Sequence, residues 1–273
     1  MHAALLRHVP PASATVSVFQ TLSMCSTVPS SHAQSDGPLA GLSSHMGGRT
    51  AGGKGKKVRH HVNPLKGHHQ RLVELPDAWA EQRYATPAAP LHMDIGCARG
   101  VFCLELAARA PDLNVLGLEI RSVLAEAANE DATQMNLTNA AFLACNANVN
   151  VRPLLERAGP SVMLRSASIQ FPDPWFKARH KKRRVVQPGL VSALTDHLAP
   201  GGWLWMQSDV LDVAQDMRDV ARATEPERLR DCLEDFENWD APKPEGLLGV
   251  ETERERASAA LDRPVYKTLF YKD

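Results

Sequence analysis

Residues 171–184, with the sequence FPDPWFKARHKKRR, combine residue types that suit the binding of a nucleic-acid base. Asp173 stands between two prolines, which fix φ and restrict the preceding residue, so we expect its carboxylate to project in one direction from a stiff loop. Trp175 and Phe176 follow and offer flat surfaces for stacking. Cations complete the segment: Lys177, Arg179, Lys181, Lys182, Arg183 and Arg184. A cationic run alone is typical of a solvated surface, but together with the acid and the aromatic pair it indicates a site that orients a base and grips phosphates.

Two segments of the chain are strongly cationic, although its formal net charge is zero. Residues 54–71 hold six Lys or Arg and no acid, and residues 177–184 hold six more, again without an acid. From residue 72 onward the remaining chain holds 17 Lys or Arg against 30 Asp or Glu. Two cationic patches on an acidic body produce a directional field, which favours a polyanionic partner such as RNA. We expect residues 54–72 to form a basic arm ahead of a folded domain at 73–273.

The first 53 residues differ in composition from the rest of the chain. They are rich in serine and alanine, and Asp36 is their only acid. Such a segment buries too little apolar surface to fold, so we expect a disordered extension at 1–53. A serine-rich, acid-poor extension favours an organellar transit peptide, and we expect the chloroplast as its destination. The alternatives are a mitochondrion, or a plain disordered tail on a cytosolic protein.

Cysteine usage and hydropathy argue against several kinds of site. The five cysteines are scattered and form no Cys-x-x-Cys pair, which argues against a disulfide framework and against a zinc site. Eight of the eleven histidines precede residue 70, and no cysteine or carboxylate joins them, so we expect no metal. No apolar run approaches the roughly 20 residues of a membrane span, so we expect no membrane partner.

Apolar runs alternate with amphipathic segments in the folded domain. The sequence predicts strands at 91–95, 114–119, 140–145, 166–171, 203–207 and 264–271, and helices at 101–109, 121–135, 188–197 and 209–223. Strands that alternate with helices indicate an α/β fold with a doubly wound, mostly parallel sheet. In such sheets ligands bind beyond the carboxyl ends of the strands, where the strand order reverses. Residues 171–184 follow the fourth strand and therefore lie at that edge.

The first three predicted strands end in residues that suit a nucleotide-type ligand. Gly96 and Gly100 let a ligand approach the backbone, but their G-x-x-x-G spacing is a weak signal that an ordinary tight turn also explains. Glu119 ends the second strand, where an acid accepts hydrogen bonds from ribose hydroxyls. Asp94 and Glu119 together favour S-adenosylmethionine, a cation without a pyrophosphate, over NAD. Asn146 follows the third strand, where it either contacts the adenine edge or caps the strand end.

Five motifs occur in one order and carry a resemblance to a known family: DIGCARG at 94–100, GLEIR at 117–121, FPDPWFKARHKKRR at 171–184, QSD at 207–209 and T-x-R-E at 252–255. From about Val58 to its C-terminus the chain resembles the tRNA (guanine-N7-)-methyltransferases of the bacterial type, especially those of cyanobacteria and plastid-bearing eukaryotes. The resemblance implies the Rossmann-like fold of S-adenosylmethionine-dependent methyltransferases. It also implies methyl transfer to N7 of a guanine in the variable loop of tRNA, which forms N7-methylguanosine. No obligate protein partner is implied, and the chain is expected to be a monomer or a homodimer.

The resemblance also implies roles for individual residues. Asp173 is implied to be the catalytic acid and to lie near the cofactor, which Asp94, Glu119 and Asn146 contact. Binding of the tRNA substrate is implied for a further set: Lys177, Asp209, Thr252, Glu253, Arg254 and Glu255. Without the resemblance, Asp209 would be interpreted as a helix N-cap and Glu255 as a solvated surface residue.

Two residues depart from the pattern of the family. Ala98 stands where many methyltransferases have a glycine, and Asn146 stands where many bacterial members have an aspartate. Both changes leave the pocket intact in outline, but Asn146 lacks the negative charge.

Guanine N7 carries an in-plane lone pair and no proton, so the reaction needs no base and depends on positioning and electrostatics. We expect an ionised Asp173 to accept hydrogen bonds from N1–H and the exocyclic amine of guanine, with Lys177 and Arg179 favouring its charged form. Residues 179–184 and the basic arm are expected to hold phosphates, which makes binding depend steeply on salt.

Two other functions remain open at this point. A methyltransferase for a small molecule or a protein would share the pocket without needing two cationic patches. A non-catalytic RNA-binding protein would tolerate a degenerate pocket, against which the presence of Asp94, Gly96, Glu119 and Asp173 argues. The glycine spacing makes a nicotinamide oxidoreductase the poorest match.

Overall fold

The computed structural model describes residues 61–233, 239 and 241–273. The N-terminal extension at 1–53 and the beginning of the basic arm lie outside the described residues. The expected transit peptide and its destination therefore remain predictions.

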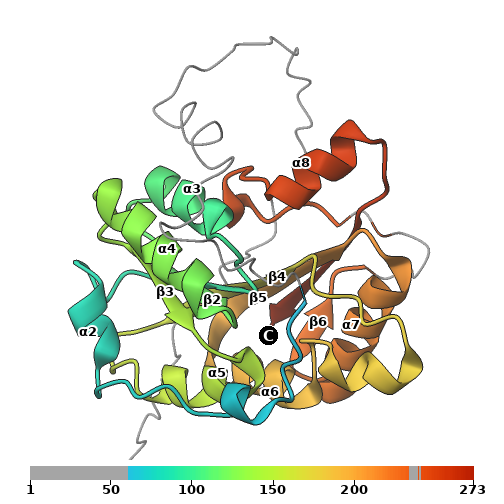
Figure 1. Ribbon diagram of the computed structural model, residues 1–273, viewed down its shortest axis with the longest axis horizontal. Coiled ribbons are helices and arrows are strands. Elements are labelled where there is room, and N and C mark those ends of the chain that lie inside the picture. Colours follow the sequence, from blue (N-terminus) through green and yellow to red (C-terminus); the bar gives the residue numbers. More distant parts are fainter. Residues whose placement is uncertain (1–60, 234–238, 240) are drawn as a thin grey trace, which may run out of the picture. The chain divides into compact units, whose positions relative to one another are not determined.

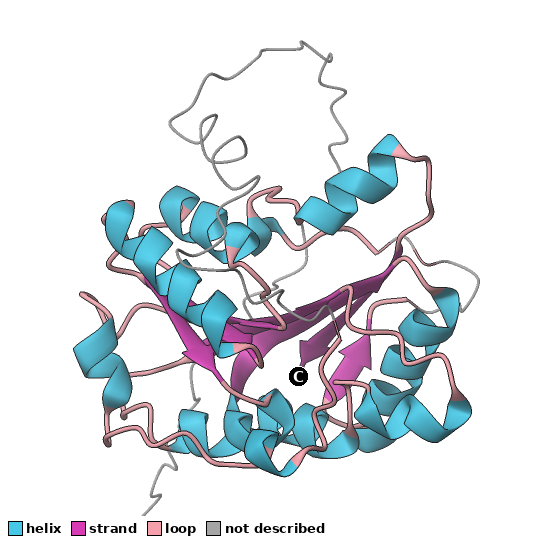
Figure 2. Ribbon diagram, in the orientation of Figure 1, coloured by secondary structure: helices cyan, strands magenta, loops and turns pink. Residues whose placement is uncertain are grey.

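Within the described residues the strands form one seven-stranded sheet (Figures 1 and 2). They are β1 (Leu91–Ile95), β2 (Asn114–Glu119), β3 (Ala140–Ala144), β4 (Leu164–Gln170), β5 (Leu198–Ser208), β6 (Leu229–Asp231) and β7 (Tyr266–Lys272). Their order across the sheet is β3-β2-β1-β4-β5-β7-β6. The first five strands pair in parallel, whereas β7 runs antiparallel to both β5 and β6. The order reverses between β1 and β4, which is where a doubly wound sheet opens a crevice for ligands.

Helices cover both faces of this sheet. They are α2 (Trp79–Arg83), α3 (Val101–Arg109), α4 (Ser122–Gln134), α5 (Ala147–Glu156), α6 (Pro188–His197), α7 (Leu211–Thr224) and α8 (Glu253–Ala260), with short 3₁₀ turns η1 (Gly67–His69), η2 (Ala178–Arg183) and η3 (Glu245–Leu247). In Figure 1, α3, α4 and α8 lie on one side of the sheet and α5, α6 and α7 on the other. This arrangement confirms the predicted α/β, doubly wound, mostly parallel fold.

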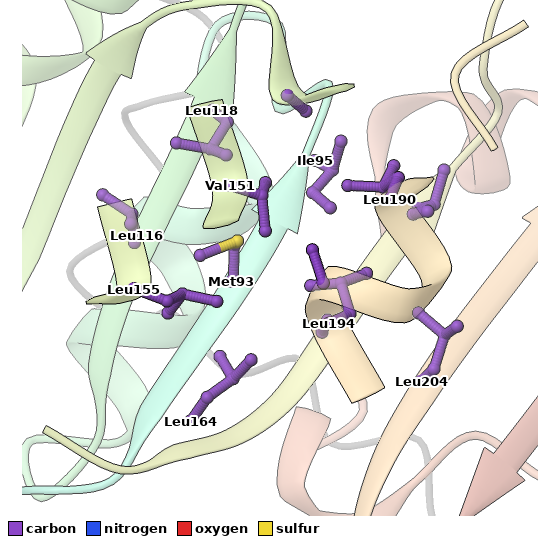
Figure 3. Packing of buried hydrophobic residues seen from close by; sticks show 14 of the residues in the cluster. Met93, Ile95, Leu116, Leu118, Val151, Leu155, Leu164, Leu190, Leu194 and Leu204 are labelled. Atoms are coloured by element: carbon purple, nitrogen blue, oxygen red, sulfur yellow. The ribbon is translucent and has the colours of Figure 1, made fainter. Parts of the chain in front are cut away.

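The apolar core lies between the sheet and helices α5 and α6. Met93 and Ile95 lie two residues apart on β1, so both side chains point to this face. Leu190 and Leu194, one helical turn apart on α6, pack against them (Figure 3). Leu194 is fully buried, so its truncation to alanine is expected to cost about 2–5 kcal/mol. The core thus fixes β1 and β4 side by side, and with them the two loops that follow these strands.

The opposite face of the sheet carries a hydrogen-bonded group of polar side chains, most of them buried, beside the indoles of Trp203 and Trp205. The polar side chains are His92, Asp94, Ser166, Ser168, Gln170 and Gln207. The Ser168 hydroxyl donates to Asp94 Oδ1 at 2.6 Å, so its contact with His92 Nε2 at 3.0 Å requires that nitrogen to carry the ring proton. Nδ1 of His92 then accepts from the Ser166 hydroxyl at 2.8 Å. Burial lowers the pKa of His92 to about 3, which keeps the ring neutral in this network.

The sequence predicted most of these elements but not all of them. Strands β1 and β2 and helices α3 and α6 have the predicted bounds, and the other predicted elements differ at their ends. Helices α2, α5 and α8 and the short strand β6 were not predicted. In α5 the sequence is rich in asparagine and contains Pro153, which are poor helix signals.

Among the described helices, none combines the length and the apolar character needed to cross a membrane. Over the same residues, His, Cys, Asp and Glu side chains form no group that could hold a metal ion.

Candidate active site at the carboxyl edge of the sheet

A cavity of about 370 Å³ lies at the carboxyl ends of β1, β2 and β4, next to the reversal of strand order. Its volume is within the range of small-molecule sites. It brings together most of the residues expected to bind cofactor or substrate: Asp94, Gly96, Glu119, Asn146, Asp173, Thr252, Glu253 and Arg254. Four others do not line it: Gly100, Lys177, Asp209 and Glu255.

Asp94 forms a fixed, buried acid at one end of the cavity. Its side chain accepts hydrogen bonds from Ser168 Oγ at 2.6 Å and from Gln170 Nε2 at 3.1 Å. Burial raises the pKa of Asp94, and these two hydrogen bonds oppose the shift because they stabilise the carboxylate. An acid held in this way can accept hydrogen bonds from an ammonium group of a ligand without being free to turn.

Glu119 is fully engaged by the chain itself. Its Oε1 accepts from the backbone N–H and from Nε of Arg121, at 2.9 and 2.8 Å. Its Oε2 accepts from the backbone N–H of Ala98 and from Nη2 of Arg121, both at 3.0 Å. A carboxylate offers about four lone-pair positions, so ribose hydroxyls gain access to Glu119 only when the Arg121 guanidinium moves aside.

The two glycines of the DIGCARG motif differ in role. Gly96 has φ of 85° and lines the cavity, and a Cβ placed on it would meet no atom within 4 Å. Gly100, with φ of 74°, packs against Phe142, whose ring would lie 2.5 Å from an added Cβ. The structure therefore corrects the expectation for Gly100, which serves the packing of α3 instead of approaching a ligand.

Asn146 caps a helix and also lines the cavity. Its Oδ1 accepts from the backbone N–H of Asn148 at 3.1 Å, which makes Asn146 the N-cap of α5. Its Nδ2 donates to the carbonyl of Pro64 at 3.3 Å. Its capping role is thus that of a helix N-cap and not of a strand end, and its contact with adenine stays a prediction.

The described part of the basic arm packs along α5 (Figure 1). Asn150 of α5 accepts from the backbone N–H of Val73 at 2.7 Å and donates to the carbonyl of Arg71 at 3.2 Å. Val62 and Pro64 line the cavity itself. This stretch of the arm thus contributes to the ligand pocket as well as to the cationic surface.

Asp173 lies at the rim of the cavity with its side chain 38% exposed. Its Oδ1 accepts a hydrogen bond from Nδ1 of His61 at 2.8 Å. Among the described residues, Lys177 and Arg179, which were expected to stabilise this carboxylate, form no ion pair with it, and His61 takes that place. Because both side chains of the pair are substantially exposed, the contact is worth at most about 1 kcal/mol.

Trp175 and Arg183 form a stacked pair beside Asp173. The backbone of Trp175 has φ of 42°, a left-handed conformation that is strained for a bulky residue. The guanidinium carbon of Arg183 lies 4.9 Å from the centroid of the indole, and both side chains line the cavity. Arg183 therefore faces the ligand pocket and supports the indole.

The structure corrects the interpretation of Arg184 as a phosphate ligand. Its side chain is 3% exposed and forms ion pairs with Asp212 and with Asp216, the latter at 3.1 Å. Its Nε donates to the carbonyl of Pro174 at 2.9 Å. Arg184 thus anchors the loop that carries Asp173 to helix α7. The remaining cations of the segment are more accessible, although Lys181 also pairs with Asp212 at 3.2 Å.

The T-x-R-E motif forms the start of helix α8. Thr252 and Glu255 make a reciprocal capping box, and Lys243 pairs with Glu255 Oε1 at 2.7 Å. Gln207 donates to Glu255 Oε2 at 3.3 Å and to Gln170 Oε1 at 2.8 Å, which connects α8 to the hydrogen bonds around Asp94. Glu255 is buried, which corrects its interpretation as a solvated surface residue, while its role in substrate binding stays a prediction.

Asp209 is not a helix N-cap, which was its alternative interpretation. Val210, and not Asp209, is the N-cap of α7. The carboxylate of Asp209 instead accepts from Nε of Arg254 at 3.0 Å, which ties the start of α7 to α8.

Three residues of the site were missed from the sequence: His61, Arg121 and Gln170. The sequence contains an indication of the role of Arg121, because a cation two positions after an acid at the end of a strand can form an ion pair with that acid. His61 had none, because its partner Asp173 is 112 residues away.

The chain is similar to known proteins over most of its length. The profile of a family described as "Putative methyltransferase" matches residues 88–268. The tRNA (guanine-N(7)-)-methyltransferase of Synechococcus elongatus is 48% identical over 216 residues, which cover 79% of this chain and 96% of that protein. The protein of the same name from a Nostoc species is 45% identical over 214 residues, with 78% of this chain and 93% of that protein covered.

Among solved structures, the aminoglycoside resistance methyltransferase NpmB1 is 16% identical to this chain and covers 74% of it, with 95% of its own length aligned and a TM-score of 0.47. That likeness is too distant to add to the argument. The sequence relatives are close and nearly complete, and the chain belongs to the tRNA (guanine-N(7)-)-methyltransferase family.

Proposed function

We propose that this chain transfers a methyl group from S-adenosylmethionine to N7 of a guanine in tRNA, and that this guanine lies in the variable loop. The observation that carries the proposal is the meeting of Asp94, Glu119 and Asp173 in one cavity. Two of these acids suit the cofactor, and the third lies at the rim, beside the cationic segment that suits RNA.

The residues of the cavity fit S-adenosylmethionine. This cofactor supplies a methyl group bound to a positively charged sulfur, together with an ammonium group and ribose hydroxyls. Asp94 is oriented to accept from the ammonium group, and Glu119 suits the ribose once Arg121 has moved. Gly96 presents no Cβ to the ligand. Nothing in this set favours a pyrophosphate, which the two acids would repel.

Asp173 is proposed to hold guanine by its N1–H and exocyclic amine. The carboxylate is an acceptor only, so it matches the two donors on that edge of the base and directs N7 away from itself. As N7 becomes bonded to the methyl group, positive charge develops on the purine, and a fixed negative charge nearby stabilises it. No proton has to be removed from N7, so Asp173 acts as a positioning acid and not as a base.

The accessible cations are proposed to hold the RNA backbone. Lys177, Arg179 and Lys182 are exposed and form no ion pair within the described part of the chain. Each phosphate contact of this kind adds about one unit to the salt dependence of binding. A methyltransferase for small molecules would not need this surface, which is why the observations favour RNA.

The proposal is tested with Asp173→Asn. This variant keeps the size of the side chain but presents an amide in place of one acceptor, so methyl transfer is expected to fall by about 100-fold or more while most tRNA affinity is retained. Asp112→Asn, a change at an exposed aspartate in the loop before β2, is the matched control. Transfer is followed with labelled cofactor, and N7-methylguanosine is mapped in the product. Turnover of Asp173→Asn at the control rate would refute the proposed role.

The identity of the substrate is tested with the unmodified protein. Labelled cofactor is supplied with tRNA, with a pool of metabolites or with protein, and the expected label is in tRNA alone. Label in metabolites or protein would favour the broader methyltransferase function. Absence of heat on titration with S-adenosylmethionine would favour a non-catalytic RNA-binding protein.

The chain is also proposed to act without a partner subunit, as a monomer or a homodimer. Activity of the purified chain alone, with its mass measured by light scattering, tests this. A requirement for a second protein would contradict it.

A further inference from the structure

The two adjacent aromatic residues of the FPDPWF segment face different surroundings. Trp175 lines the cavity, whereas Phe176 does not. The left-handed backbone of Trp175 allows this division, because it turns the chain sharply between the two side chains. The aromatic pair therefore offers one ring to the pocket and one to the surface.

The indole of Trp175 is already surrounded. The guanidinium of Arg183 lies over it, the ring of His180 meets it edge-on at 5.8 Å between centroids, and the ring of His61 lies at 6.5 Å. The guanidinium thus occupies one face that a base would use for stacking. Trp175 is a wall of the pocket, and less of its ring is open than in an exposed aromatic side chain.

Phe176, in contrast, is 71% exposed, the highest value among the large apolar side chains of the described residues. An isolated exposed apolar residue is ordinary on a protein surface. Phe176 differs because Lys177 and Arg179 follow it, both exposed and without an ion pair in the described chain. An open aromatic ring beside free cations is the combination that binds single-stranded nucleic acid through its bases and its phosphates.

We propose that Phe176 is a stacking platform for an unpaired base that adjoins the target guanine in the RNA. The inference rests on the proposed function and adds a second base-binding site to it. Asp173 and Phe176 are three residues apart, so their backbones are separated by at most about 11 Å. A guanine held at Asp173 therefore brings the next nucleotide of the same strand close to Phe176. Because every base has a π-face, this contact adds affinity and register without selecting a base type.

Four variants separate stacking from other roles of the side chain. Phe176→Ala is expected to weaken tRNA binding by about 5- to 100-fold, measured by filter retention. Phe176→Trp keeps an aromatic ring and is expected to bind as the wild type does, whereas Phe176→Leu keeps apolar surface and is expected to resemble Phe176→Ala. Met163→Ala is the matched control, since Met163 is also exposed but precedes β4, at the opposite edge of the sheet. Affinity for S-adenosylmethionine is expected to be unchanged in all four.

A second measurement identifies the base. Abasic sites are introduced, one at a time, at the unpaired positions that adjoin the methylated guanine. At the position that stacks on Phe176, the abasic tRNA is expected to bind wild type and Phe176→Ala equally, because neither can form the contact. A penalty for Phe176→Ala that is the same on every abasic tRNA would overturn the proposal, as would wild-type binding by both Phe176→Ala and Phe176→Leu. If the wild type forms no N7-methylguanosine on intact tRNA, the proposed function itself fails, which is a separate result.

Discussion

Arg184 offers the sharpest test of the structure, because the sequence and the structure predict opposite consequences for its removal. As one cation in a basic run, its replacement would weaken RNA binding and leave the fold intact. As the buried partner of Asp212 and Asp216, its replacement destabilises the protein and loosens the loop that carries Asp173. The change to make is Arg184→Met, which keeps the aliphatic length and removes the charge.

The expected loss of stability follows from the exposure of the partners. Removing one member of a fully buried ion pair costs about 3–5 kcal/mol, mainly because the other charge is left without compensation. Here the side chains of Asp212 and Asp216 are 55% and 27% exposed, so water recovers part of that cost. We therefore expect a decrease of about 2–3 kcal/mol in the free energy of unfolding. For a domain of this size that corresponds to a drop of about 5–10 °C in Tm.

The assay compares Arg184→Met with Lys182→Met, two positions away in the same segment and exposed. Arg184→Met is expected to lower Tm and kcat, with little change in the salt dependence of tRNA binding. Lys182→Met is expected to leave Tm unchanged, weaken tRNA binding and reduce the salt slope by about one unit. A wild-type Tm for Arg184→Met together with a reduced salt slope would show that Arg184 contacts phosphate after all, and would refute the structural argument.

Three further predictions concern the side chains of Arg121, His61 and His92. Arg121→Ala frees the Glu119 carboxylate and is expected to tighten S-adenosylmethionine binding by several-fold in calorimetry; weaker binding would mean that Arg121 contacts the cofactor. His61→Ala is expected to lower the KM for tRNA by up to about fivefold, the equivalent of a surface ion pair, since Asp173 is then open; a raised KM would show that His61 positions the acid. The pKa of His92 is about 3 in the folded protein, below the unfolded value, so the unfolded state takes up a proton first and stability falls as pH drops from about 6.5 toward 3. Between pH 7 and 4.5, the free energy of unfolding measured with urea is expected to fall by about 2–3 kcal/mol more in the wild type than in His92→Asn. An equal dependence on pH in the two proteins would contradict a neutral, buried ring.

The strands that build the site could be predicted because buried parallel strands are continuous apolar runs that end at turn residues. Asn114–Glu119 is mostly apolar and ends in the ligand-type acid Glu119. Leu91–Ile95 is also buried and is ended by Gly96, although it carries the polar residues His92 and Asp94 between its apolar ones. Helix α5 could not be predicted in the same way. Its strongest local signal, the cap at Asn146, is also the signal of a polar ligand residue after a strand, and one sequence does not distinguish the two.

Within the site, the acids were predictable and their partners were not. Asp173 is marked by the prolines on either side of it, but nothing local marks Arg184 as the cation that turns inward among six similar ones. The information lies in the partner helix, where Asp212 and Asp216 are four residues apart and therefore share one face of α7. A pair of acids at helical spacing becomes informative only when the helix and the cationic loop are known to be neighbours.

Two ion pairs around the FPDPWF loop differ in exposure. Asp173 is held by His61, and both of these side chains reach solvent, so a ligand can displace His61. Arg184 is held under the loop by two acids and a backbone carbonyl, and almost none of it reaches solvent. Because an exposed pair contributes at most about 1 kcal/mol while a buried charge without partners costs several, a ligand is expected to replace His61 at Asp173 and to leave the contacts of Arg184 in place. Asp173 can therefore become available to guanine without a movement of the loop that carries it.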